Sequence, residues 1–421
     1  MKSRQVIGVY LFDIELGRIG YDVDRAVASF QYSPGFLESN QLKEVFPYTG
    51  HIRRVPQVQV FRQFSSGPFR GLPPQFADSL PDLFGSMIFK TWLDARGERD
   101  ISVIEQLAYV ADRGMGALSY APAQDLPSTA DINLDEIIEI LRAVMDNKKS
   151  TTQKKLSTAA LINIFKIGSS AGGARPKVLI SEHKRTGAVL PGDLECSEDY
   201  NHYLVKLAMD TEAFPREIIE YAYHLVATET LGIDMMGSKL IDDKHFATLR
   251  YDRQGGEKQH VLTASGLTGW DFQDPATSSY EHLFRLCSFL KIPQAEVEAL
   301  YRRMVFNVVF RNTDDHMKNH AFVYTREEDR WHLAPAYDLT YALNPLMDFR
   351  RANRALSING KRSDISRADL NTIAEAFTVK NATGIIQEVN QAIPVLALHL
   401  SELEVPHIIR ENVLNKVSPI A

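Results

Sequence analysis

The chain has 421 residues, which is too many for one ordinary core and suggests roughly two to three domains. Its composition is 44% hydrophobic and 24% charged, as in soluble globular proteins, and its net charge of −6 argues against broad nonspecific binding of nucleic acid. The two cysteines, Cys196 and Cys287, provide neither a disulfide framework nor a cysteine-based zinc site, which suits a reducing compartment.

The N-terminus lacks the pattern of a secretory signal. The apolar run 6–12 is short and is followed closely by Asp13 and Glu15. No apolar run approaches the ~20 residues that a membrane-spanning helix needs. We therefore expect a cytoplasmic protein that makes no membrane contact.

In chain order, the sequence pattern changes from strand-rich to mixed and then to helical. Apolar, aromatic and β-branched residues around glycines predict strands at the start, and Pro56 places one of them at a sheet edge. The expected strands here cover 6–12, 17–32 and 55–61, and the expected helices cover 75–93, 101–112 and, after a linker at 121–129, 134–146.

Beyond an exposed connection at 147–155, strands and helices are mixed. We expect strands at 162–165, 178–180 and 203–207, a helix at 215–231, and paired strands at 245–251 and 260–263 around the Gly255-Gly256 turn. Further helices are expected at 279–290, 294–311, 367–376 and 383–401, with strands at 320–324 and 331–333.

A glycine-rich stretch at 168–177 lies between two of the expected strands. Such a loop lets the backbone approach a ligand closely and point N–H groups at phosphate oxygens. The stretch matches neither a Walker A sequence nor GxGxxG, so a plain hairpin turn is the alternative interpretation.

Lys206 lies in an apolar strand, where an ammonium group is costly unless it is paired. Kinases place a phosphate-neutralising lysine in this way, although a lysine at a strand edge can also extend to water. We expect a pairing carboxylate from the next helix, where Glu217 and Glu220 are candidates and Glu220 is preferred.

The densest group of polar side chains is 311–319, Arg-Asn-Thr-Asp-Asp-His-Met-Lys-Asn, with Asp338 after it. Phosphoryl transfer from ATP needs one carboxylate to orient a hydroxyl, and an amide and a second carboxylate to hold Mg²⁺. Asp314 suits the first role, and Asn319 and Asp338 suit the second. The alternatives are a solvated polar turn and, for Asp338, an Asx-turn or a helix cap.

His316 and Lys318 would lie near the phosphates of ATP. A competing interpretation is a metal site, because His316 and His320 are four residues apart and could share one face of a helix. The sequence is not His-Glu-x-x-His, which disfavours a zinc hydrolase.

The order of these features is more informative than any one of them. A glycine loop, a strand lysine, a helix glutamate, an Asp-x4-Asn pair and a later aspartate follow one another as in a protein-kinase-like fold.

On these residues the chain resembles the HipA-type serine/threonine kinase toxins of bacterial type II toxin–antitoxin systems. The resemblance runs over nearly the whole chain. It is strongest in 170–177, 245–253, 304–324 and 333–340, and most specific in 306–319 together with 335–338. The segment 69–83 looks like the β-rich domain that precedes the kinase in this family.

The resemblance implies an α+β fold, protein-kinase-like and bilobal. An N-terminal β-rich coupling subdomain would cover 1–120, and a linker with a helix would cover 121–155. The kinase N-lobe, with its phosphate loop, would cover 156–255, and a helical C-lobe would cover 256–421.

By position, the resemblance also implies roles for single residues. Asp314 is similar to the catalytic aspartate, and Asn319 and Asp338 are similar to the metal-binding residues. Ser170 falls on the serine that is autophosphorylated, with Ser169 as a second acceptor, and a phosphate there would eject the loop and switch the kinase off. The residues implied to contact ATP are Gly172, Gly173, Ala174, Lys177, Lys206, Leu249, Arg250, Tyr251, His316, Lys318, Asn319, Tyr337 and Asp338.

The implied activity is that of an ATP- and Mg²⁺-dependent protein serine/threonine kinase that acts as a toxin. Its substrate would be a translation component such as an aminoacyl-tRNA synthetase. A small HipB-like helix-turn-helix antitoxin would hold it and bind DNA.

Two alternatives stay open. One is a small-molecule phosphotransferase. The other is an antitoxin-bound DNA corepressor with incidental kinase activity. The sequence support for the second is a basic cluster, which otherwise forms an ordinary solvated face: Arg350, Arg351, Arg354, Lys361 and Arg362. The role of Asp315 is left undefined.

Overall fold

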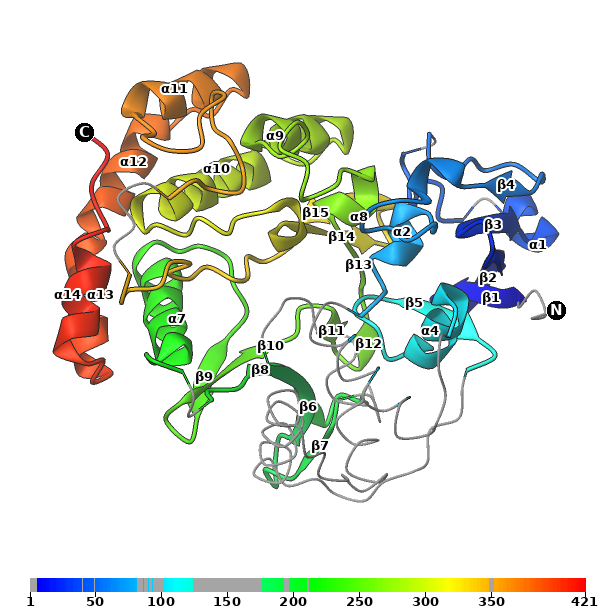
Figure 1. Cartoon of the computed structure of the whole chain (residues 1–421), viewed down its shortest axis with the longest axis horizontal. Coiled ribbons are helices and arrows are strands. Elements are labelled where there is room, and N and C mark those ends of the chain that lie inside the picture. The colour runs from blue at the N-terminus through cyan, green and yellow to red at the C-terminus, as the bar shows by residue number, and fades with distance from the viewer. Residues whose placement is uncertain are drawn as a thin grey trace. The chain divides into compact units, whose positions relative to one another are not determined.

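Figure 1 shows a computed structural model of the chain. The structure describes residues 6–39, 41–48, 50–81, 101–123, 176–192, 197–209, 212–347 and 352–421, together with Ser86, Lys90 and Leu93. The chain divides into two compact units: unit 1 comprises Met1–Met209 with Ala247–Val261, and unit 2 comprises Asp210–Phe246 with Leu262–Ala421.

Unit 1 begins with an antiparallel sheet in the strand order β4-β3-β2-β1-β5. Ile7, Val9 and Leu11 of β1 are buried because alternate side chains of a strand point to the same face. Helix α4 packs on this sheet, and a capping box between Ser102 and Glu105 starts it. The elements are β1 (Val6–Leu11), β2 (Ile14–Asp22), β3 (Val27–Tyr32), α1 (Pro34–Glu38), β4 (Gln59–Val60), α2 (Pro74–Ala77), α4 (Val103–Val110) and β5 (Leu118–Ala121), with a 3-10 turn at Arg62–Phe64.

The strand expected at 55–61 is shorter than predicted but lies at the sheet edge, as Pro56 indicated. Part of the helix expected at 75–93, all of the helix expected at 134–146 and the strand expected at 162–165 lie outside the described residues.

A second sheet of unit 1 contains β7, β6, β8 and β10 in that order. In the antiparallel pair of β6 and β8, Lys177 stands directly opposite Lys206. The strands are β6 (Lys177–His183), β7 (Val189–Pro191), β8 (Tyr200–Lys206) and β10 (His245–Leu249), and the first residues of β10 belong to unit 2.

The expected pairing of 245–251 with 260–263 is wrong. The Gly255-Gly256 turn joins two shorter strands, β11 (Arg253–Gln254) and β12 (Glu257–Lys258). β13 (His260–Thr263) instead starts the three-stranded sheet β13-β14-β15, which contains β14 (Ala321–Thr325) and β15 (Arg330–Leu333). The sequence located the turn correctly, but the turn connects the short strands β11 and β12. The longer strands β10 and β13 pair with other strands.

Unit 2 is mainly helical. Its elements are α7 (Arg216–Leu225), a π-helical turn (Val226–Thr230), β9 (Ser238–Ile241), α8 (Ala264–Thr268), α9 (Tyr280–Phe289), α10 (Gln294–Val309), a 3-10 turn (Met317–Asn319), α11 (Arg367–Ala376), α12 (Ala382–Gln391), α13 (Ile393–Glu402) and α14 (His407–Leu414). Helix α13 lies beside α7 and α14, as the green and red helices of Figure 1 show. None of the helices in the described ranges is long and apolar enough to cross a membrane.

The helices expected at 279–290, 294–311 and 367–376 are confirmed as α9, α10 and α11. The single helix expected at 383–401 is wrong, because the chain forms α12 and α13 with a break at Ala392. Pro394 lies in the first turn of α13, where its missing N–H does not cost a helical hydrogen bond.

Candidate active site

The polar motif 311–319 occupies the connection between α10 and β14. Helix α10 ends at Val309, and the carbonyl of the next residue, Phe310, accepts a hydrogen bond from the hydroxyl of Tyr223 at 2.9 Å. Arg311 then adopts a left-handed backbone conformation with φ of 59°, which turns the chain out of the helix. The motif is therefore held in a loop with a defined start.

The two adjacent aspartates of the motif lie in different environments. Asp314 is exposed, whereas Asp315 is only 1% exposed. The amide nitrogen of Asn319 donates to the backbone carbonyl of Asp314 at 2.7 Å, and the backbone N–H of Asn319 donates to the carbonyl of His316 at 2.8 Å. The loop thus brings Asp314 and Asn319 together, as their spacing predicted.

Asp315 forms a buried ion pair. Its Oδ2 accepts hydrogen bonds from Arg354 Nη2 at 2.6 Å and from the hydroxyl of Tyr280 at 2.7 Å. Burial lowers the pKa of Arg354, but the carboxylate of Asp315 more than offsets this, so that the pKa is raised. The segment that contains Arg354 also binds the loop through its backbone: the N–H of Ala355 donates to the carbonyl of Thr313 at 2.8 Å.

The described residues of the basic cluster proposed from the sequence have partners within unit 2. Arg354 is buried in the ion pair and belongs neither to a DNA contact nor to a solvated face. Lys361 pairs with Asp369 at 2.8 Å, and Arg362 donates to backbone carbonyls, including Ser278 O at 3.0 Å. Arg350 and Arg351 lie outside the described residues.

Asp338 also has an uncommon backbone conformation, with φ of 53°. Its neighbour Tyr337 donates its hydroxyl to the carbonyl of Lys318 at 2.7 Å, which ties the segment to the motif. The preceding Ala336 donates its N–H to Asp234 O at 2.8 Å. No helix begins at Asp338, so a helix cap does not account for this residue.

The aromatic ring of Phe272 lies beside the motif. Its centroid is 5.4 Å from that of His316, and the ammonium group of Lys318 is 5.5 Å from the centroid of the Phe272 ring. Met317, between these two, is fully buried. The motif therefore presents His316 and Lys318 on one side and anchors itself through Met317.

His320 is buried, and burial lowers its pKa to about 4, so that it is neutral at pH 7. His316 and His320 flank the 3-10 turn Met317–Asn319 in extended conformations, so no α-helix face joins them. Across the described part of the chain, no group of three or more His, Cys, Asp or Glu side chains is arranged to hold a metal ion. The zinc interpretation has no support from this geometry.

Magnesium differs from zinc in its ligands, because it binds oxygen atoms and retains several water molecules. The amide nitrogen of Asn319 donates to the Asp314 carbonyl, so the amide oxygen of Asn319 points away from that carbonyl. One amide oxygen and the carboxylate of Asp338 make a donor set that fits Mg²⁺ and would leave positions for phosphate oxygens and water.

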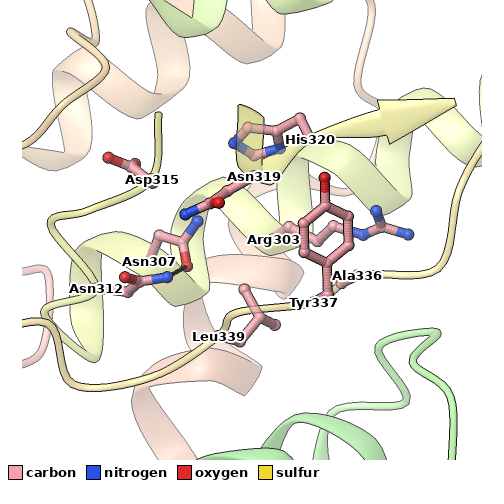
Figure 2. Close-up of a pocket in the computed structure, with 9 residues that line it drawn as sticks. All are labelled: Arg303, Asn307, Asn312, Asp315, Asn319, His320, Ala336, Tyr337 and Leu339. Carbon is pink, nitrogen blue, oxygen red and sulfur yellow. Dashed lines mark hydrogen bonds between the residues drawn. The ribbon is translucent and has the colours of Figure 1, made fainter. Parts of the chain in front are cut away.

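A small pocket lies behind the motif (Figure 2). Side chains from α10, the motif and the segment around Tyr337 converge on it. Its lining residues are Arg303, Asn307, Asn312, Asp315, Asn319, His320, Ala336, Tyr337 and Leu339. The sequence suggested no role for Asn307, Asn312 or Arg303. Asn307 and Asn312 lie in the stretch where the family resemblance is most specific, which marks them, whereas nothing in the sequence marks Arg303.

In unit 1, two predicted ATP contacts face one another. Lys177 and Lys206 are directly opposite in the β6–β8 pair, and both are less than a tenth exposed. Directly opposed like charges destabilise an antiparallel pair unless an anion or carboxylates compensate them. Glu217 and Glu220 are buried in α7 of unit 2, so the predicted pair of Lys206 with Glu220 stays a prediction.

Leu249 is the last residue of β10, and Arg250 and Tyr251 follow it in unit 1. Arg250 N donates to His202 O at 2.8 Å, and the guanidinium of Arg250 donates to both carboxylate oxygens of Asp252, at 2.9 and 2.7 Å. Any adenine contact by Arg250 would therefore use its backbone. The predicted loop residues Ser169, Ser170, Gly172, Gly173 and Ala174 lie outside the described residues.

Comparison with known families decides the membership of the chain. The profile of the HipA-like C-terminal domain matches residues 169–396, and that of the HipA N-terminal domain matches residues 7–121. The chain belongs to the HipA family. No curated protein sequence matches it.

Among solved structures, the HipA fold of the chain is similar to the Shewanella oneidensis MR-1 toxin–antitoxin system HipA in its complex with HipB and operator DNA. The two are 15% identical, the TM-score is 0.65, and the match covers 98% of this chain and 96% of the other. A weaker match is to the Helicobacter pylori proinflammatory kinase CtkA, at 11% identity and a TM-score of 0.41, covering 59% of this chain and 88% of the other. The likeness to the S. oneidensis HipA fold confirms the α+β fold class expected from the sequence, and the limits expected for the domains stay predictions.

Proposed function

We propose that the protein is an ATP- and Mg²⁺-dependent serine/threonine protein kinase that acts as the toxin of a type II toxin–antitoxin system. The observation that carries the proposal is the motif loop, in which exposed Asp314 is hydrogen-bonded through its carbonyl to Asn319. Membership of the HipA family supports the assignment.

In this proposal, catalysis is mainly positioning and charge neutralisation. Asp314 accepts a hydrogen bond from the substrate hydroxyl and orients its oxygen toward the γ-phosphate. Asn319 and Asp338 hold Mg²⁺, which would neutralise charge on the phosphates. His316 and Lys318 lie next to this pair along the motif and contact the phosphate oxygens.

Strand register holds Lys177 and Lys206 side by side in unit 1, where both would contact phosphate oxygens of the nucleotide. The glycine loop, Gly172 to Ala174, would add backbone N–H groups. Leu249 to Tyr251 would contact the adenine, with Arg250 acting through its backbone because Asp252 binds its side chain.

For partners, we propose a small HipB-like antitoxin that brings the protein to DNA, since the similar S. oneidensis HipA is found with HipB and operator DNA. An aminoacyl-tRNA synthetase is our candidate substrate, Ser170 or Ser169 is our candidate for autophosphorylation, and the cytoplasm is our expected location. The alternative of a DNA corepressor is weakened, because Arg354, Lys361 and Arg362 are engaged within unit 2. A small-molecule phosphotransferase stays the second candidate.

The test is phosphoproteomics of cells that express the wild type or Asp314→Ala at matched levels. We expect one or a few Ser/Thr sites, including one in the glycine loop, to gain phosphate only with the wild type. Asp314 is exposed, so the substitution should leave the fold intact, which circular dichroism checks. If no protein gains phosphate with the wild type, the protein-kinase proposal fails, and phosphate transfer to a small molecule would favour the second candidate.

A further inference from the structure

A line of buried hydrogen bonds leads from Asp315 to Asp338. The Tyr280 hydroxyl donates to Asp315 at 2.7 Å, and the amide nitrogen of Asn307 donates to the Tyr280 oxygen at 2.9 Å. The amide nitrogen of Asn312 then donates to the Asn307 oxygen and to the backbone carbonyl of Asp338, both at 3.0 Å. We call these residues the relay; Figure 2 shows its bond between Asn307 and Asn312.

The direction of every bond in the relay is fixed at the Asp315 end. The Asp315 carboxylate is paired with Arg354 and can only accept, so Tyr280 must donate to it. Burial and the Asp315 charge raise the pKa of Tyr280 well above its ordinary value, which keeps its proton in place. The Tyr280 oxygen must then accept from Asn307.

The same argument fixes the orientation of the side-chain amides of Asn307 and Asn312. Asn307 presents its nitrogen to Tyr280, so it presents its oxygen to Asn312, and Asn312 must turn its nitrogen inward. That nitrogen also reaches the Asp338 carbonyl. A flipped Asn312 amide would place its oxygen against two acceptor oxygens. Its own oxygen is buried without a partner among the described residues, so only the nitrogen fixes the orientation.

The far end of the relay is a residue that needs support. Asp338 has φ of 53°, a left-handed conformation that is unfavourable for a residue with a Cβ and that persists when its surroundings hold it. A hydrogen bond to the Asp338 carbonyl resists rotation of the adjoining peptide. That rotation would redirect the Asp338 side chain.

We propose that Asn312 is a positioning residue, which holds the Asp338 carboxylate in the direction required for a divalent cation, with Asn307 and Tyr280 fixing the Asn312 amide. The inference rests on the proposed function, in which Asp338 is a metal ligand. It also gives Asp315 a second role beside its ion pair, because Asp315 sets the direction of the relay.

The test measures metal affinity by electron paramagnetic resonance of Mn²⁺ in the full-length protein saturated with a non-hydrolysable ATP analogue. Asn312→Ala and Tyr280→Phe should each weaken Mn²⁺ binding about 10-fold or more, the range found for residues that orient metal ligands. The affinity of the analogue without metal should stay unchanged. Neither variant should weaken binding further when Asp338→Asn is already present.

Tyr301→Phe is the matched control. Tyr301 is fully buried in α10 and donates its hydroxyl to Leu370 O at 3.2 Å, outside the relay. This variant loses a buried tyrosine hydrogen bond in the same unit and should keep wild-type Mn²⁺ affinity. Wild-type Mn²⁺ affinity in folded Asn312→Ala and Tyr280→Phe would overturn the relay. If Asn312→Ala does not fold, the milder Tyr280→Phe decides alone. If the wild-type protein binds no Mn²⁺ with the analogue, the proposed function fails instead.

Discussion

At the scale of single residues, the neighbouring Asp314 and Asp315 differ in exposure and in their partners. Asp314 faces solvent, and Asp315 lies at the centre of a buried ion pair with Arg354. The spacing of Asp314 and Asn319 could be recognised from sequence because the two lie five positions apart in one loop. The partners of Asp315 could not, because Tyr280 and Arg354 lie 35 and 39 positions away. Only the tertiary fold brings them together.

We expect Arg354→Met to destabilise unit 2 by about 3–5 kcal/mol, because it leaves the Asp315 carboxylate buried and without its cation. Urea unfolding, followed by tryptophan fluorescence and circular dichroism, measures the loss. Lys361→Met is the matched control, because it removes a cation whose side chain is 50% exposed and should cost at most about 1 kcal/mol. Equal effects of the two substitutions would contradict the importance of burial.

At the scale of elements, the sequence predicted most helices and several strands but not their partners. The alternation in 6–11 and the helical period of 294–309 are local properties of the chain. Which strand pairs with β10 or β13 depends on residues far away, and the Gly255-Gly256 turn misled the pairing because it serves a shorter hairpin. The sequence did not predict the break at Ala392, because the apolar residues keep their helical spacing across it. The chain nevertheless ends α12 before Ala392 and begins α13 after it.

A buried charge cluster joins two distant elements of unit 1. Asp252, fully buried, accepts hydrogen bonds from Arg250, Arg253 and the backbone N–H of Gly116, the latter at 2.8 Å. Arg253 also donates to Gly114 O at 3.0 Å. The turn after α4 is thus tied to the loop after β10. Burial raises the pKa of Asp252, but the two guanidinium groups outweigh it and hold that pKa well below its usual range.

Asp252→Asn should therefore destabilise unit 1 by about 3 kcal/mol, because two buried arginines lose their counter-ion. Hydrogen exchange should show the backbone of 112–116 and 250–258 opening together in this variant. Because the pKa of Asp252 is lower in the folded chain, the wild type holds this stability above about pH 4 and loses it as the pH falls further. Asp112→Asn, which removes an exposed carboxylate 3.6 Å from Lys258, is the control and should leave exchange at 250–253 unchanged.

At the scale of the whole molecule, buried histidines give both units the same response to acid. Burial lowers the pKa of His202, His224 and His320 to about 4 and that of His260 to about 3. His202 and His260 belong to unit 1, and His224 and His320 belong to unit 2. In the unfolded chain these groups titrate near pH 6.5.

At pH 5 the folded chain therefore keeps these imidazoles neutral while the unfolded chain protonates them. Stability is full above about pH 6.5 and is lost as the pH falls toward about 4, and each unit takes up about two protons on unfolding. The slope of the unfolding free energy against pH, from urea titrations, counts these protons. His224→Gln should reduce the slope for unit 2 by about one proton, and substitution of exposed His407 should not change it. A flat profile between pH 6 and 4.5 would refute this account.

Unit 1 is completed by a segment that lies late in the sequence, and this affects folding during synthesis. Unit 1 contains Ala247–Val261, which includes Asp252 and its two arginines, so the N-terminal sheet and its helix α4 wait for partners that the ribosome supplies more than a hundred residues later. Until Arg253 has left the exit tunnel, the carbonyls of Gly114 and Gly116 lack the guanidinium group that binds them in the folded chain. Unit 1 of a nascent chain therefore cannot complete its contacts until more than half of the protein has been synthesised.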